Sequence, residues 1–292
     1  MQAPSANPPW PIIDSVYAEM LSSAPPDRRW LLAQTLATAQ SRRALQQSLA
    51  ISPGSRVLDV GCGFGASSLE LAALRPLSVV GVDIDTSVLD VASAALAEVS
   101  ARQALDPGSK VSFQAGDAYE LPFDDGSQDV VFSRFVFQHL DSPGVGASEL
   151  ERVLRPGGLA CVVDVDDGLS ISEPPPSGAY LRLAGALRAA QSGVGGDRHI
   201  GRRLAGLLDF HGLAPTAVLV LPQAAYHTPA PGDPARQLLI ERLNLARDSI
   251  LAGGHMTGED FEADLQEIST ELPGPTCEIE AHLAVVAVKP AE

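Results

Sequence analysis

The chain is poor in cysteine. Its three cysteines, Cys62, Cys161 and Cys277, lie far apart, and no two of them form a Cys-x-x-Cys pair. An odd and scattered set of this kind provides neither a disulfide framework nor a zinc site. The pattern favours a reducing compartment, and we expect a cytoplasmic protein.

Basic residues are also scarce. The chain has only 20 Lys and Arg but 36 Asp and Glu, so its formal net charge is −16 at pH 7. Because binding to nucleic acid or to an anionic membrane requires a basic face, we expect neither partner. Three arginine pairs are the local exceptions, and they are Arg28-Arg29, Arg42-Arg43 and Arg202-Arg203.

Long apolar runs are missing as well. The longest ones have the length of a strand, and residues 1–13 lack the basic stretch and apolar run of a signal peptide. The sequence therefore predicts no membrane span, and it predicts that residues 1–13 are a disordered lead-in.

Short apolar strands alternate with helical segments over most of the chain. The predicted strands are 56–60, 78–82, 110–114, 128–133, 159–165, 213–221 and 281–288. Strands that are apolar on both faces and alternate with helices indicate a parallel sheet covered on each side. The sequence thus predicts an α/β fold.

Three irregular segments are added to this alternation: the first and the last are mostly helical, and the second is rich in Pro and Gly around one helical stretch, 180–191. They are 14–50, 166–197 and 233–270. The first is expected to form two helices with Asp14 and Asp27 as N-caps. None of the three has enough apolar residues for a core of its own. We therefore expect one domain over 1–292, with a core of 51–165 and 200–292 and a lid formed by the additions.

The strongest motif is a strand that leads into three alternate glycines and then a helix. It reads Val57-Leu58-Asp59-Val60-Gly61-Cys62-Gly63-Phe64-Gly65. Such a turn lets the backbone approach a ligand closely, and its glycine spacing also matches a dinucleotide fingerprint. Asp59 is the residue that distinguishes between a dinucleotide and a cationic ligand. A carboxylate would repel a pyrophosphate but attract the ammonium and sulfonium groups of S-adenosylmethionine (SAM).

Acidic residues also follow the next two strands. Asp83 lies 22 positions beyond Gly61, which is the range at which an acid meets a ribose diol. The alternative for Asp83 is a helix N-cap, a role that we assign to Asp85. Asp117 is placed to accept a hydrogen bond from the adenine amino group, or else it begins an Asx-turn.

Together with 127–134 and 135–140, these motifs resemble the class I SAM-dependent methyltransferases of the small-molecule type. The resemblance covers about 56–165 and is weaker beyond. It implies a Rossmann-like seven-stranded, mostly parallel sheet with helices on both faces and an antiparallel strand from the last hairpin. It also implies SAM as cofactor, S-adenosylhomocysteine (SAH) as product and a small-molecule acceptor.

The resemblance also assigns roles to residues. The glycine turn would hold the methionine part of SAM, Asp83 the ribose and Ile84 one adenine face. Ser133 and Arg134 would lie near the methionine carboxylate or sulfur, and Tyr17 would close over the cofactor. The expected cofactor contacts are Tyr17, Asp59, Gly61, Gly63, Asp83, Ile84, Asp117, Ala118, Ser133 and Arg134.

Transfer from a sulfonium is an in-line displacement, so the protein aligns the reacting atoms, and a hydroxyl acceptor also needs a base. His139, after the fourth strand, is the candidate base, and packing or capping is its alternative. His199 and Arg202 begin a helix that should face the crevice, and His227 ends the next strand. These three are candidate substrate contacts, while a solvated helix start is the alternative for the first two.

Asp164, Asp166 and Asp167 cluster at the end of the fifth strand. Three carboxylates can hold a hard cation, but no Asn or Gln neighbours them, so we expect no metal. The sequence predicts a methyltransferase for a small molecule, in secondary metabolism by its Ala-, Gly- and Pro-rich composition. The alternative is a methyltransferase-fold enzyme that uses SAM for decarboxylation or cyclisation. No feature of the sequence indicates an oligomeric state.

Overall fold

A computed structural model describes residues 9–228, 233–270 and 275–291. Seven strands form one sheet in the order β3-β2-β1-β4-β5-β7-β6. Six of them run in one direction, and β7 is antiparallel to both of its neighbours. The strands are β1 (Arg56–Val60), β2 (Ser78–Asp83), β3 (Lys110–Ala115), β4 (Gln128–Arg134), β5 (Leu154–Glu173), β6 (Ala214–His227) and β7 (Thr276–Val288). This is the predicted Rossmann-like sheet.

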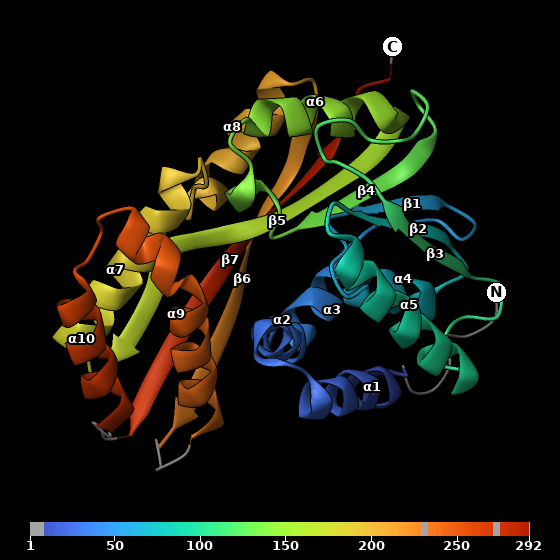
Figure 1. The fold of residues 1–292 in the computed structure, drawn as a ribbon. Coiled ribbons are helices and arrows are strands. Elements are labelled where there is room, and N and C mark those ends of the chain that lie inside the picture. Colours follow the sequence, from blue (N-terminus) through green and yellow to red (C-terminus); the bar gives the residue numbers. More distant parts are fainter. Residues whose placement is uncertain (1–8, 229–232, 271–274, 292) are drawn as a thin grey trace.

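Helices cover both faces of the sheet (Figure 1). The side chains of Leu58 and Val131 pack under α6 (Pro143–Val153) and α8 (Leu204–Phe210). Their neighbours Val57 and Val130 point the other way, because successive strand residues alternate between faces. That second face packs against α3 and α4. The helices of this side are α1 (Trp10–Ser23), α2 (Pro26–Ala37), α3 (Ala39–Ser48), α4 (Ala66–Leu74) and α5 (Thr86–Ala101).

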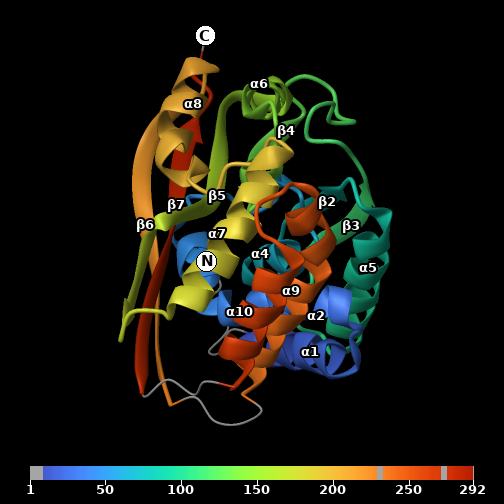
Figure 2. The ribbon, with the colours of Figure 1, turned by 60° about the vertical axis from the view of Figure 1, so that its left-hand side comes forward.

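Strands β5, β6 and β7 are longer than predicted. Residues 170–173 of β5 continue beyond a register shift and pair with 277–280 of β7, where the sequence predicted an irregular segment. That prediction was wrong because the backbone hydrogen bonds come from a strand more than a hundred residues away. The ends of β5, β6 and β7 pair side by side and extend past the rest of the sheet (Figure 2). We call this part of the three strands the hairpin extension.

Three helices pack over this hairpin extension and around an apolar cluster of their own. They are α7 (Gly178–Gly193), α9 (Pro234–Ala252) and α10 (Gly258–Thr270). Leu183 of α7, Leu243 of α9 and Phe261 of α10 are buried together. The segments 166–197 and 233–270 each have too few apolar residues for a core of their own. Their helices therefore form one apolar core together (Figures 1 and 2).

The first helices also differ from the prediction. There are three between residues 10 and 48, and α1 begins at Trp10, inside the segment expected to be disordered. Neither predicted N-cap caps a helix: Asp14 lies inside α1 and pairs with Arg43, while Asp27 lies in the first turn of α2. No helix within the described ranges is long and apolar enough to cross a membrane.

Candidate functional site

The glycine turn connects β1 to α4, and its backbone N–H groups are largely used within the protein. The N–H groups of Gly61 and Cys62 both donate to the Val82 carbonyl, at 2.8 and 2.9 Å. That of Gly63 donates to Asp83 Oδ2 at 2.8 Å. A pyrophosphate is bound by free N–H groups of such a turn. This turn offers few of them, so its geometry disfavours a dinucleotide.

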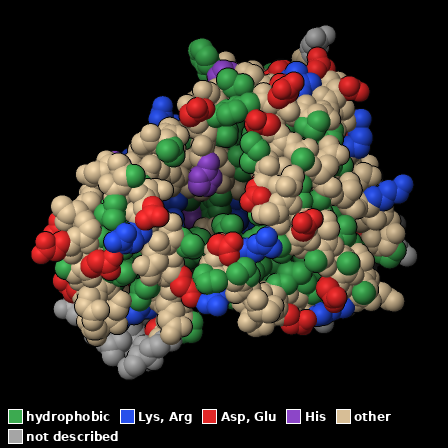
Figure 3. All heavy atoms as spheres, in the orientation of Figure 1, with side chains coloured by type: hydrophobic (Ala, Val, Ile, Leu, Met, Phe, Trp, Pro, Cys, Tyr) green, Lys and Arg blue, Asp and Glu red, His purple; other side chains and the backbone are tan. Residues whose placement is uncertain are grey.

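A cavity of about 620 Å³ opens where the strands β1, β2, β3 and β4 end. Figure 3 shows this face hollowed at its centre, with histidine side chains at the hollow. Eight of the ten predicted cofactor residues line the cavity. They are Asp59, Gly61, Gly63, Asp83, Ile84, Asp117, Ala118 and Arg134. Parallel strands bring these residues together because their carboxyl ends lie at the same edge of the sheet.

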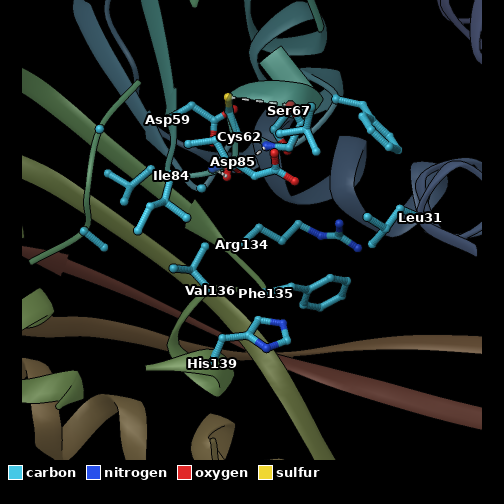
Figure 4. A pocket seen from close by; sticks show the side chains of 18 of the residues that line it. Leu31, Asp59, Cys62, Ser67, Ile84, Asp85, Arg134, Phe135, Val136 and His139 are labelled. Atoms are coloured by element: carbon cyan, nitrogen blue, oxygen red, sulfur yellow. Dashed lines mark hydrogen bonds between the residues drawn. The ribbon is translucent and has the colours of Figure 1, made fainter. Parts of the chain in front are cut away.

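Asp59 and Arg134 are the charged side chains at the inner end of the cavity. Asp59 is 1% exposed and accepts a hydrogen bond of 2.6 Å from the Ser68 hydroxyl. Burial raises the pKa of the Asp59 carboxyl to about 7. Arg134 extends across the cavity toward Leu31 (Figure 4). Its guanidinium lies 3.7 Å from the centroid of the Phe135 ring, and it has no ion pair among the described residues.

Asp83 and its neighbours form the wall after β2. Both oxygens of Asp83 accept backbone N–H groups, from Gly63 at 2.8 Å and from Asp85 at 3.1 Å. Asp85 accepts from the Ser87 N–H and caps α5, as predicted. Ile84 is an apolar side chain that is 73% exposed within a cavity wall. Asp117 accepts from the Tyr119 N–H, so an Asx-type turn is present at the cavity edge.

Two predicted cofactor residues do not line the cavity. Tyr17 is buried below the glycine turn, where its hydroxyl donates to the Phe64 carbonyl at 2.8 Å. Ser133 is fully buried in β4, and its hydroxyl has no partner in the described structure. Tyr17 therefore supports the turn from behind. Arg42 and Tyr119 line the cavity but were not predicted as contacts, because nothing local in the sequence distinguishes them.

His139 lies in the opposite wall of the cavity from Asp59 (Figure 4). Burial, followed by the charges of Arg198 and Arg242, lowers the pKa of its imidazole, which is therefore neutral at pH 7. The short helix 137–139 that carries it is held by Asp164, which accepts the Gln138 N–H at 3.1 Å. His139 is thus a fixed, uncharged imidazole that faces the cavity.

A second cavity of about 460 Å³ lies between the hairpin extension and the helices α2, α7 and α9. Gln34 lines both cavities, which places them side by side. Phe135 lies near their boundary: it lines the first cavity, and its ring centroid is 4.6 Å from that of His282, which lines the second. Its φ of 62° is a left-handed conformation that a bulky residue rarely adopts. Such strain is typical of functional sites.

Two of the three predicted substrate contacts, His199 and Arg202, lie outside both of these cavities. Arg202 is paired with Asp166, and His199 lies 3.4 Å from the same carboxylate. Neither lines the first or the second cavity. The side chain of His227 lies outside the described structure. Arg198 lines the second cavity instead, two positions after the glycine pair 195–196.

The aspartates at the end of β5 each have a partner. Asp164 is fully buried and accepts the N–H groups of Val165 and Gln138, and burial raises the pKa of its carboxyl to about 7. Asp166 pairs with Arg202, and Asp167 pairs with Arg198 at 2.7 Å. These carboxylates therefore hold the segments around the second cavity together.

Comparisons with known proteins agree with this fold. A family model described as a methyltransferase domain matches residues 58–162. An O-methyltransferase of Pyrenophora dematioidea is 31% identical over 139 residues, which is 46% of this chain and 50% of the relative. The matches with the curated relatives span about half of each relative's length.

Solved structures share the fold at low sequence identity. A crystal structure of a protein from Bacillus halodurans C-125 has a TM-score of 0.58 and 18% identity, and the match covers 86% of this chain and all of the other. The crystal structure of the [4+2]-cyclase SpnF has a TM-score of 0.53 and 17% identity, with 87% and 82% covered. The match over residues 58–162, the curated relatives and the shared fold together show that the chain is similar to the class I SAM-dependent methyltransferases.

Proposed function

We propose that this protein uses SAM to methylate a small molecule that binds in the second cavity. The observation that carries the proposal is the first cavity, in which an arginine without an ion pair faces the same space as two carboxylates. A fungal relative is named an O-methyltransferase, which favours a hydroxyl acceptor. The placement in secondary metabolism depends on the composition of the chain alone.

The residues of the first cavity fit the chemical groups of SAM. Arg134 would pair with the methionine carboxylate, and Asp59 would face the ammonium side. Asp83 would accept from the ribose hydroxyls, since each carboxylate oxygen has a further lone pair, and Ile84 would cover one adenine face. Backbone groups of Gly61 and Gly63 allow close approach, and Asp117 with Ala118 would border the base. Bound SAM would supply a methyl group activated by a sulfonium.

We propose His139 as the general base for a hydroxyl acceptor. Its imidazole is neutral at pH 7, faces the first cavity and is held near the second by the 137–139 turn. It can therefore take the acceptor proton as the oxygen attacks. General-base contributions are roughly 10²- to 10⁴-fold. His139→Gln should lower kcat by that order while leaving SAM affinity within about twofold; an unchanged kcat would exclude this role.

The cofactor assignment is tested by calorimetric titration with SAM. Asp83→Ala removes a charged acceptor that contributes about 1.5–3 kcal/mol, so the Kd should rise roughly ten- to a hundredfold. Asp90→Ala is the matched control, because Asp90 is an exposed acid on α5 away from the cavity. Equal affinities in the wild type and Asp83→Ala would refute the ribose assignment.

The reaction itself is tested by product analysis. A methyltransferase must form one SAH for each methylated acceptor, which mass spectrometry measures in the presence of SAM and a panel of hydroxylated small molecules. The cyclase among the structural neighbours shows that the fold alone does not decide the reaction. A new product without SAH would instead support a methyltransferase-fold enzyme for decarboxylation or cyclisation.

A further inference from the structure

The second cavity has an apolar wall and a charged wall. Its apolar wall is formed by leucines of α7 and α9, including Leu183, Leu187, Leu239 and Leu243. Charged and polar side chains come from the end of β5, from β7 and from the segment before α8. Its volume of about 460 Å³ lies within the range of small-molecule pockets. The cavity suits a compact ligand with an apolar body.

Most charges at this cavity are already compensated. Asp166 pairs with Arg202, and Asp167 pairs with Arg198 at 2.7 Å and with Arg188 at 3.7 Å. The Arg198 Nη1 also donates to Gln138 Oε1 at 2.8 Å, so each of the three guanidinium nitrogens already makes a hydrogen bond.

Arg242 of α9 is different. Within the described part of the chain it has no carboxylate partner, and its guanidinium carbon lies 4.5 Å from the centroid of the Trp30 ring. Stacking on an indole occupies the face of a guanidinium and leaves its in-plane N–H donors available. Burial, followed by the charge of Arg198, lowers the pKa of Arg242, and the carboxylates of Asp167 and Glu280 act on it without forming an ion pair in the described structure. A carboxylate would supply a counterion through two parallel hydrogen bonds.

The remaining carboxylate of the cavity limits the charge of the ligand. Glu280 is exposed on β7 and forms no ion pair with Arg242 in the described structure. Burial, followed by the nearby charge of Glu278, raises the pKa of the Glu280 carboxyl. A second anionic group on the ligand would meet this repulsion. The cavity therefore favours a ligand with one negative charge, placed at Arg242, over a ligand with two.

We infer that the acceptor is an acidic small molecule with an apolar body and one carboxylate, and that Arg242 recognises the carboxylate. This inference rests on the proposed function, which makes the second cavity the acceptor site. The geometry also relates the anchor to the reaction. Gln34 lines both cavities, so an acceptor held by Arg242 lies in the cavity that adjoins the one lined by the proposed base, His139.

The test compares acids with their uncharged counterparts. Benzoate, cinnamate and 2-naphthoate, each beside its carboxamide, are titrated by calorimetry into the full chain saturated with SAH. At least one acid should bind about tenfold more tightly than its amide, which corresponds to 1.4 kcal/mol. In Arg242→Gln that preference should fall below about twofold, while the amide affinity stays the same. Arg182→Gln is the control, because Arg182 is an exposed arginine of α7 that pairs with Asp264 outside the cavity.

The outcomes separate this inference from the proposed function. No preference for any acid, or a preference that persists in Arg242→Gln, overturns the inference. Titration of SAH alone into the same three proteins is the second readout. Equal SAH affinities show that the variants are folded and that the cofactor cavity is intact. If the wild type does not bind SAH, the proposed function fails, and with it the assignment of this cavity to an acceptor.

Discussion

At the scale of single residues, two glycines of one turn have different reasons to be glycine. Both have positive φ, +68° at Gly61 and +51° at Gly63. A Cβ on Gly61 would lie 2.1 Å from Val136 Cγ2, whereas a Cβ on Gly63 would meet nothing within 4 Å. Gly63 lines the first cavity. The first glycine is therefore required by packing, and the second leaves space that the cofactor would occupy.

This difference gives a paired prediction. Gly63→Ala should cost only the backbone penalty of about 1–2 kcal/mol in urea unfolding, yet weaken SAM binding more than tenfold. Gly61→Ala should unfold at lower urea than Gly63→Ala, because Val136 must also move. Calorimetry and urea titration on both variants measure the two effects. Wild-type SAM affinity in Gly63→Ala would contradict the assignment of this turn to the cofactor.

Asp59 predicts a pH dependence. Burial raises the pKa of its carboxyl to about 7, above the ordinary value, so the folded state holds the proton more tightly than the unfolded chain. The contribution of Asp59 to stability is thus lost as pH rises from about 4 to about 7. A cationic ligand favours the ionised form, so SAM affinity should rise with pH by about tenfold per unit below 7 and level off above.

Titrations of SAM between about pH 5.5 and 8.5 measure this dependence. Asp59→Asn should abolish the slope, because the amide does not ionise. Asp164→Asn is the matched control: burial raises the pKa of the Asp164 carboxyl to about 7 as well, but Asp164 does not line the cavity. A slope that survives in Asp59→Asn would show that another group titrates.

At the scale of elements, one buried carboxylate joins α3 to α4. Glu70 of α4 is fully buried and accepts from Arg42 Nη2 at 2.8 Å and from Arg43 Nε at 2.7 Å, and Arg43 also pairs with Asp14 of α1. The sequence presents Arg42-Arg43 as a local basic spot. The structure shows instead that this pair is buried and neutralised.

Removing this carboxylate should be costly. Glu70→Gln leaves the buried guanidinium of Arg42 without its counterion and leaves Arg43 with Asp14 as its only carboxylate, and breaking a buried pair costs about 3–5 kcal/mol. Urea unfolding should show that loss. In the control Glu98→Gln, an exposed ion pair with Arg102 is removed, and the change should stay below about 1 kcal/mol. Equal stability of the two variants would mean that the network is not a structural link.

At the scale of the whole molecule, the additions divide into two groups. Helix α1 is attached to the core by three contacts. Tyr17 donates to the Phe64 carbonyl, Asp14 pairs with Arg43, and Glu19 pairs with Arg102. In contrast, α2 contacts α9 through Arg29–Glu241 at 2.6 Å and through the stacking of Arg242 on Trp30. Helix α2 lines both cavities and α9 lines the second, and the ion pair that joins the two helices is partly exposed.

Hydrogen exchange should therefore distinguish these groups. We expect exchange in α2, α7 and α9 to slow when SAM or SAH binds, because these helices border the cavities and closure over ligands orders such elements. Exchange in α1 and in β1 should change little. Mass spectrometry of peptides from the free and SAH-bound protein measures both sets. Equal protection of α2 and α9 in the two states would show that they are fixed walls.

Much of the core was predictable from the sequence. The observed β1 to β4 agree with the predicted strands to within one residue at each end, because apolar runs and glycines are local signals. For the same reason, eight predicted cofactor residues line one cavity. Tyr17 and the extended hairpin were not predictable in detail. The burial of Tyr17 depends on the position of α1, and residues 170–173 form a strand only because β7 lies beside them.

The sequence by itself determined the sheet, its glycine turn and the acids at its edge, because periodicity and chain order suffice to place strand ends together. Only the tertiary structure decided which charges remain free to act. The sequence does not distinguish Arg198, Arg202 and Arg242. In the structure, Arg198 pairs with Asp167 and Arg202 with Asp166, whereas Arg242 is stacked on Trp30. Ion pairing depends on distances of a few ångströms between distant segments, and those distances exist only in the folded chain.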